Sequence, residues 1–219
     1  MQTTSAGRVA GRLAFLAACA ATVLAPIHAL ARFATVEGAR DLDSPLVRWW
    51  AEPAARGLRP MLDWSGPYTV YVAYGRIWFS ILIAATVAAF VVRRARTPVG
   101  LELWGWRIAL TGYVLATLSV VGDYWTPWLD ESFMFLGIPG MFIGLIGSSV
   151  LGIAWLRRAL RPAATGWLLA TWPVTLFCLA AVVALGAGLL PMVWAWGLVG
   201  RRLEHTAESA GADALSAAH

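Results

Sequence analysis

Arg76 is the residue whose type and surroundings most clearly suggest chemistry in this sequence. It interrupts an apolar run that continues after it from Ile77 to Val92. If this run is a membrane-crossing helix, Arg76 lies about 7 Å to the outer side of the helix centre, at about 1.5 Å per residue. A charge at this depth usually faces the inside of a helix bundle and has a partner, or its side chain extends toward the membrane surface. We expect Asp123, at the outer end of the next antiparallel run, to be that partner.

Aromatic side chains flank the expected ion pair and predict a pocket that opens toward the outer leaflet: Tyr71, Tyr74, Tyr124, Trp125 and Trp128. Three interpretations are open. The pair could be purely structural, inside the belt of Tyr and Trp that is common at membrane surfaces. It could bind an amphiphile, with the headgroup at Arg76 and the tail against the rings. Asp123 could also be a catalytic acid that acts on a lipid or isoprenoid.

Other kinds of chemistry have little support in the sequence. His28, His205 and His219 show no spacing of three or four residues, and Cys19 and Cys178 form no C-x-x-C motif. We therefore expect no metal site, haem or other cofactor. The basic residues are all arginine and form short clusters at the ends of apolar runs. Nucleic-acid binding is not expected, because it requires a basic stripe or patch.

The composition excludes an ordinary soluble domain. Of the 219 residues, 59% are apolar and 13% are charged, and the mean hydropathy is +0.67. A soluble domain is about one quarter charged, and a disordered chain has low hydrophobicity. We predict an all-α, polytopic transmembrane helical bundle whose main partner is the lipid bilayer. Residues 1–203 form one membrane-embedded domain, and residues 204–219 form a mobile C-terminal tail.

Five apolar runs are long enough to cross a membrane as helices, which takes about 20 residues. The predicted spans cover residues 12–30, 68–92, 103–124, 133–156 and 166–190. The first run could instead be a cleaved secretory signal, because Ala29-Leu30-Ala31 has an A-x-A pattern.

The last apolar stretch, residues 165–200, is too long for one straight helix and too short for two full crossings with a turn. We predict a single helix, bent at Pro173 or Pro191, whose end at Trp194 to Trp196 lies at the membrane surface. Six spans are the alternative.

The segment 32–67 is too long for a bare loop in a compact protein. Asp43-Ser44-Pro45 is a helix start, and the residues after it mix Trp and Leu with Arg. We predict short amphipathic helices in this first extracytoplasmic loop. They could form a lid over a site or a connector that lies on the membrane.

The placement of arginines predicts the orientation in the membrane. Five arginines lie in the segment 32–66, and eight lie before the first span and after the second and fourth spans: Arg8, Arg12, Arg93, Arg94, Arg96, Arg157, Arg158 and Arg161. Arginine and lysine are enriched in cytoplasmic loops. We therefore predict a multi-pass protein of the cell (plasma) membrane with a cytoplasmic N-terminus. With five spans, the C-terminal tail lies outside.

Small residues recur every four positions in the fourth span, at Gly140, Gly144, Ser148 and Gly152. Such a face lets two helix backbones touch. We expect it to receive another helix of this chain, such as the third span with Gly112 and Ala116. A protein partner or a second copy in a homo-oligomer is the alternative occupant.

The leading functional hypothesis is a non-catalytic accessory or amphiphile-binding membrane protein that uses Arg76, Asp123 and the nearby aromatic residues. The alternative is a small membrane-embedded enzyme that acts on a lipid or isoprenoid, with Asp123 as the acid. A small-solute transporter ranks third. Transporters need polar relays near the membrane midplane, and the middle positions of these spans are apolar or small apart from Ser and Thr hydroxyls.

Overall fold

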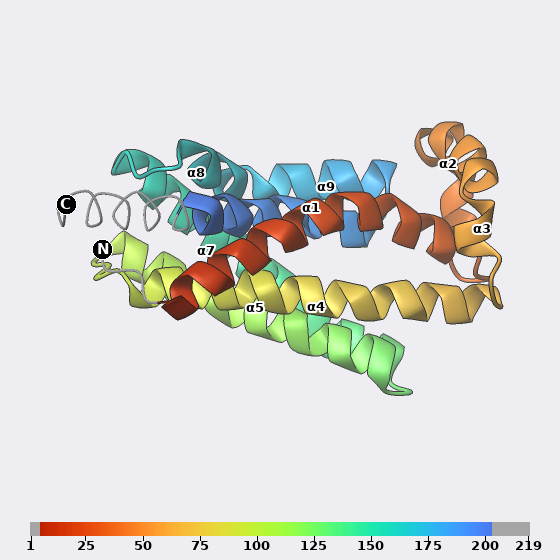
Figure 1. The fold of residues 1–219 in the computed structure, drawn as a ribbon, viewed down its shortest axis with the longest axis horizontal. Helices are drawn as coiled ribbons and strands as arrows, with labels where there is room; N and C mark the ends of the chain where they lie inside the picture. The colour runs from red at the N-terminus through yellow and green to blue at the C-terminus, as the bar shows by residue number, and fades with distance from the viewer. Residues whose placement is uncertain (1–4, 203–219) are drawn as a thin grey trace, which may run out of the picture.

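The chain forms an elongated bundle of helices (Figure 1). The computed structural model describes residues 5–202, and no strand occurs among them. The tail 204–219 lies outside the described residues. Four helices are long and apolar enough to cross a membrane. They are α1 (Ser5–Phe33), α4 (Pro67–Arg94), α5 (Leu101–Trp125), and the helix formed by the π-helical turn η2 (Phe133–Gly137) with α7 (Ile138–Arg157). The prediction of an all-helical chain with apolar helices in the first four predicted spans is confirmed.

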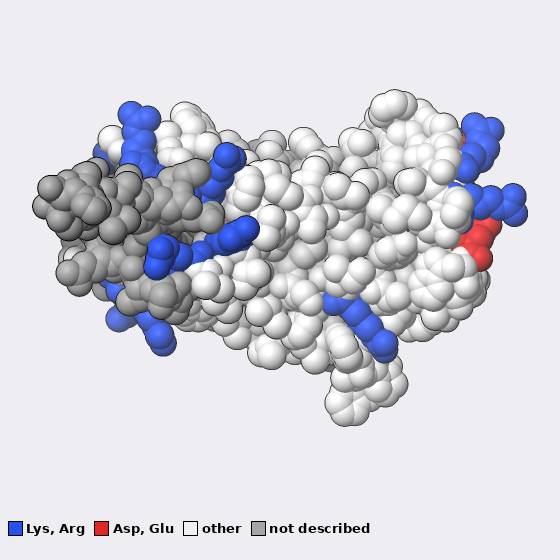
Figure 2. All heavy atoms as spheres, in the orientation of Figure 1, with Lys and Arg blue, Asp and Glu red and all other residues white. Residues whose placement is uncertain are grey.

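The surface of the bundle has the charge distribution that a membrane requires. On the face shown in Figure 2, the side chains between the two ends are almost all uncharged, and arginines gather toward the ends. Large apolar side chains point outward along the helices, including Leu16, Ile83 and Ile146. In water such a surface would be unfavourable, whereas lipid solvates it.

Residues that start and stop helices set the helix ends. Pro67 lies in the first turn of α4, which ends at Arg93 and Arg94. The turn that follows contains Gly100 with a φ of +59°, a conformation that glycine adopts without strain. Cationic side chains in a last turn also interact favourably with the negative end of the helix dipole.

The segment between α1 and α4 is largely helical. It contains the 3₁₀ helix η1 (Ala39–Asp43), α2 (Pro45–Gly57) and α3 (Arg59–Leu62). α2 begins at the predicted Ser44-Pro45 start and buries Val47 and Ala51. The Trp50 indole donates a hydrogen bond to the Val182 carbonyl at 2.7 Å. α2 and α3 therefore cover one end of the bundle, on the right in Figure 1.

The last apolar stretch does not run in one direction. α8 (Ala163–Ala170) and α9 (Trp172–Val182) meet at a bend of 66° next to Pro173, which lacks the N–H that a continuous helix needs. The 3₁₀ helix η3 (Leu185–Leu189) then reverses the chain, and residues 190–202 return as a helix. Gly200 packs directly against Gly11. Residue 200 therefore lies at the end of the bundle where α1 begins. The five-span prediction placed the chain after its last span at the opposite end, and the position of residue 200 contradicts it.

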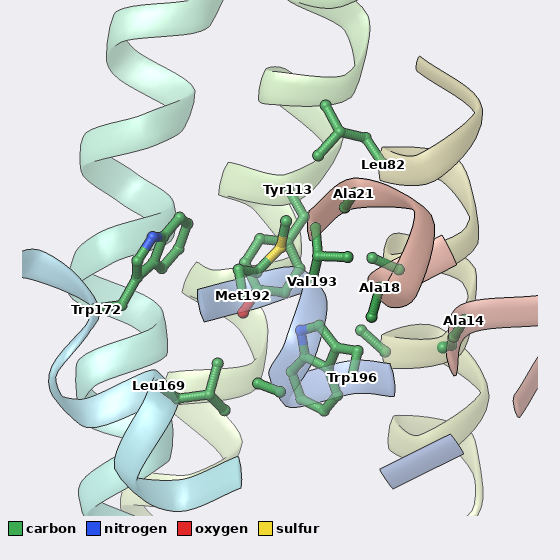
Figure 3. Close-up of a cluster of buried hydrophobic side chains, with 14 of the residues drawn as sticks. Ala14, Ala18, Ala21, Leu82, Tyr113, Leu169, Trp172, Met192, Val193 and Trp196 are labelled. Carbon is green, nitrogen blue, oxygen red and sulfur yellow. The ribbon is translucent and has the colours of Figure 1, made fainter. Parts of the chain in front are cut away.

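The returning helix 190–202 enters the core, which corrects the expected place of Trp196. Its side chain is fully buried, and its ring centroid lies 5.1 Å from that of Trp106 on α5. Figure 3 shows Trp196 in a cluster with Ala18 of α1 and Tyr113 of α5. Trp194 is partly buried and donates to the Thr22 hydroxyl at 2.9 Å. The reversal within residues 183–189 turns both indoles into the bundle instead of toward the membrane surface.

Helices α5 and α7 touch along their backbones. A Cβ atom built on Gly112 would collide with the backbone of Gly144, and one on Gly140 would lie 2.7 Å from the Ala116 nitrogen. Ser148 continues the same face, and its hydroxyl lies 2.6 Å from that of Tyr113. Gly152, one turn further, meets α8 instead. Helices of this chain thus occupy the small-residue face of α7.

A buried carboxylate joins two turns at the opposite end from α2. Glu102, at the start of α5, is 1% exposed and accepts hydrogen bonds from Arg96 at 3.0 Å and Arg158 at 2.6 Å. The Trp106 indole donates to the same carboxylate at 3.4 Å. Arg96 follows α4 and Arg158 follows α7, so one acid connects both turns.

The contact between α5 and α7 predicts the effect of adding one methyl group. Gly112→Ala should lower the melting temperature in detergent by roughly 2–10 °C, because overpacking costs about 1–3 kcal/mol. Alanine favours helices over glycine by about 1 kcal/mol, so propensity alone predicts the opposite sign. Gly57→Ala in α2 is the control, since its new Cβ would meet no atom within 4 Å. Equal melting temperatures for the two variants would contradict this packing.

Candidate functional site

A cavity of about 720 Å³ lies in the half of the bundle that α2 covers. Its walls come from α1, α4, α5, η2, the end of α9 and η3, and residues near η1 and the start of α2 close one side. This volume is within the range of small-molecule pockets, roughly 300–1,000 Å³. The cavity therefore has space for a ligand rather than only for water.

His28 of α1 belongs to a hydrogen-bonded group in the cavity wall that the Tyr124 hydroxyl connects. Its side chain is 7% exposed, and its ring stacks on Tyr71 of α4 with centroids 5.0 Å apart. The His28 Nε2 lies 3.1 Å from the Tyr124 hydroxyl, which donates to the Tyr71 hydroxyl at 3.1 Å. Gly75 leaves room for the Tyr124 ring, because any side chain there would collide with it. Three helices thus contribute to one polar cluster.

Asp123 also lines the cavity, one residue before Tyr124. Ser119, which is 2% exposed, lies one helical turn earlier, and its hydroxyl oxygen is 3.3 Å from the nearer Asp123 oxygen. A carboxylate at this position can accept hydrogen bonds from a ligand or, when protonated, donate one.

Two arginines and an aspartate lie at the part of the cavity nearest η1. Arg32 and Asp41 form an ion pair at 3.1 Å, and their side chains are 43% and 41% exposed. Arg40 also lines the cavity. With Asp123, the lining holds two arginines and two aspartates, so its formal charges balance.

Apolar side chains form the rest of the wall, including Leu82, Phe133, Met141 and Leu189. Trp78 of α4 has both an apolar ring and a polar N–H group. It is 3% exposed, and its buried indole N–H has no hydrogen-bond partner among the described residues. An unpaired buried donor is costly, and the buried Trp155 and Trp196 indole N–H groups, which do not line the cavity, are unpaired within residues 5–202 as well.

The structure brings together only some of the residues expected at the Arg76–Asp123 site. Tyr71, Asp123 and Tyr124 line the cavity. Tyr74 donates to the Met61 carbonyl at 2.8 Å and so ties α4 to α3. Trp125 and Trp128 are 56% and 66% exposed, and neither lines the cavity.

Arg76 lies outside the cavity and is exposed. Its Nε donates to the Tyr124 carbonyl at 3.1 Å, and its guanidinium lies 4.8 Å from the centre of the Trp125 ring. Among the ion pairs between described residues, none joins Arg76 to Asp123. The two residues stay at the same end of the bundle but belong to different surfaces.

His28 and Arg32 are the site residues that sequence spacing missed. The search for partners three or four residues away applies to one helix, whereas the partners of His28 come from α4 and α5. The sequence does contain a signal for His28, because an ionisable residue inside an apolar span commonly marks a functional position. In residues 5–202, no group of three or more His, Cys, Asp or Glu is arranged to hold a metal ion.

Comparisons with models of protein families, with curated proteins and with solved structures found no match to this chain. Its function is therefore inferred from the cavity and the side chains that line it.

The polar cluster predicts a measurable cost for removing one hydroxyl. Tyr124→Phe leaves the ring in place but removes the group that bonds both His28 and Tyr71. Hydrogen bonds between membrane helices contribute about 1 kcal/mol, so the melting temperature in detergent should fall by about 2–4 °C. Tyr68→Phe, on the exposed first turn of α4, is the matched control. A Tyr124→Phe protein as stable as this control would show that the cluster does not stabilise the fold.

Proposed function

We propose that this protein is an integral membrane protein that binds an uncharged amphiphile in the cavity and acts as a non-catalytic accessory protein. The observation that carries the proposal is that the cavity wall contains both polar and apolar side chains. One part is polar, with His28, Tyr71 and Tyr124, and the other is apolar, with Leu82, Met141 and Leu189. A ligand with a polar head and an apolar tail matches both parts.

The balance of charges supports an uncharged headgroup. The two arginines and two aspartates of the lining offset one another, and Arg32 is already paired with Asp41. An ionised headgroup entering the cavity would lose its hydration, which is costly, and an anionic one would compete with Asp41 for Arg32 or rely on the exposed Arg40. A hydroxyl or carbonyl oxygen would instead accept the unpaired N–H of Trp78.

We also propose a cytoplasmic N-terminus in the plasma membrane, with the α2 end of the bundle outside. The contact of Gly200 with Gly11 supports this orientation, because it adds Arg201 and Arg202 to the eight arginines at the α1 start. An excess of arginine is typical of cytoplasmic loops. The broken α8–α9 helix and the returning helix 190–202 would then cross the membrane as a fifth and a shorter sixth segment.

Filling the cavity should weaken amphiphile binding. Leu82 lines the cavity and is 1% exposed, whereas its neighbour Ile83 is 39% exposed on the outer surface of α4. We expect Leu82→Trp to weaken binding of a photoactivatable long-chain alcohol by roughly tenfold, or about 1.4 kcal/mol. Ile83→Trp should bind like the wild type. Trp78→Phe, which keeps the ring but removes the donor, should also weaken binding. Labelling is measured by mass spectrometry of the purified protein, with unlabelled alcohol as competitor.

Two results would contradict an uncharged ligand in this cavity. The first is equal labelling of the Leu82→Trp and Ile83→Trp proteins, which would place the probe on the outer surface. The second is stronger labelling by the carboxylic acid of the same chain length than by the alcohol, which would indicate that an anionic headgroup is preferred.

A second candidate function is an enzyme that acts on a lipid or isoprenoid, and the position of Asp123 in the cavity wall favours it. A positioned acid contributes about 10²–10⁴-fold to a rate. If Asp123 is that acid, Asp123→Asn should reduce conversion of a membrane lipid extract by at least about 100-fold. Asparagine keeps the size and a hydrogen-bonding oxygen, so the variant should still bind the alcohol probe within severalfold of the wild type, and conversion is measured by mass spectrometry of the lipids. Equal conversion by the variant and the wild type, or no conversion by either, would contradict a catalytic Asp123.

A further inference from the structure

Arg76 differs from the arginines of the bundle that form close ion pairs. Arg96 and Arg158 share Glu102, and Arg32 pairs with Asp41. Arg76 forms no ion pair with any carboxylate whose side chain the structure describes, although it lies nine positions inside the apolar helix α4. A cation in an apolar span normally has a partner of opposite charge or reaches the membrane surface. A guanidinium that reaches the membrane surface can bind an anionic group from outside the chain.

Contacts on one side hold the Arg76 guanidinium in place. Its Nε–H is used by the Tyr124 carbonyl at 3.1 Å, and its centre lies 4.8 Å from the Trp125 ring centre. An arginine has five N–H donors, so the four on the two Nη atoms remain for a ligand. Stacking on an aromatic ring fixes the plane of the guanidinium. Less side-chain entropy is then lost when a second group binds.

The surroundings of Arg76 are those of a lipid headgroup region. Trp125 is the last residue of α5, so a guanidinium beside it has reached from within α4 toward the helix ends. Trp125, Trp128 and Phe135 are all more than half exposed around the turn that follows α5. Indole rings prefer the boundary between lipid tails and headgroups. Glu131, in the short helix α6 (Leu129–Ser132), is exposed and makes no ion pair with Arg76.

We infer that Arg76, held by Trp125 and the Tyr124 carbonyl, binds the phosphate of a membrane phospholipid on the outer surface of the bundle. Phosphate is the anion that every phospholipid headgroup presents at this depth, and a guanidinium can bind it through two parallel N–H···O bonds. This site is separate from the cavity, because Arg76 does not line it. The exposed rings of Trp125 and Trp128 would contact the glycerol and upper acyl chains of the same lipid.

Native mass spectrometry of the protein in non-ionic detergent tests this inference. The probes are dioleoyl phosphatidylglycerol and dioleoylglycerol, which share acyl chains and differ in phosphate. We expect the wild type to bind one phosphatidylglycerol at least about tenfold more tightly than dioleoylglycerol, the scale of one charge-assisted contact. Arg76→Gln should remove this preference. Arg76→Lys should restore part of it, because lysine keeps the charge but not the planar fork.

Two further variants separate this site from general attraction and from the cavity. Arg56→Gln removes another exposed arginine, in α2, and should bind phosphatidylglycerol like the wild type. Leu82→Trp should also leave phosphatidylglycerol binding unchanged while it blocks the alcohol probe, so the two proposals can fail independently. Equal loss of binding in Arg76→Gln and Arg56→Gln would overturn the inference. So would equal affinity of the wild type for the two lipids.

Discussion

The backbone contact between α5 and α7 determines where the site residues lie. Lipid gives helices no hydrophobic reason to associate, so close van der Waals packing must hold them. Gly112 meets Gly144 and Gly147 meets the Ala109 backbone, and any added side chain would separate the helices. This seam fixes the position of α5 along its length. The last turn of α5 carries Asp123 and Tyr124, and a change in the seam would therefore move both residues relative to His28.

The two ends of the bundle differ in what they bury. At the α1 start, Glu102 is 1% exposed and its counter-charges come from two turns of the same chain. A buried carboxylate is tolerated only when it is paired and hydrogen-bonded. At the other end, the Trp78 N–H lies in a cavity wall without a partner among the described residues. One end therefore buries a charge that the chain itself pairs, whereas the other end keeps an open cavity.

The sequence predicts the long helices well because each one combines an apolar run with arginine, proline or glycine at its ends. It does not predict the reversal at η3, because the length argument assumes straight helices of uniform pitch. The bend of 66° before α9 and the compact turn at Gly186 and Gly188 shorten the path. The expected Arg76–Asp123 pair shows a second limit. Helix spacing gives the height of each residue, but the rotation of α4 and α5 decides which surface each one faces.

The separation of Arg76 from the cavity gives a physical basis for selectivity. Phospholipids outnumber any other amphiphile in a bilayer, and each carries a phosphate. A phosphate that entered the cavity would lose its hydration and would have to compete with Asp41 for Arg32 or rely on the exposed Arg40. Outside, Arg76 offers a cation that the Tyr124 carbonyl and the Trp125 ring already hold in place and that need not leave the membrane surface. The favourable place for a phosphate is therefore the outer surface, and the cavity is left to a ligand whose oxygen needs only hydrogen bonds.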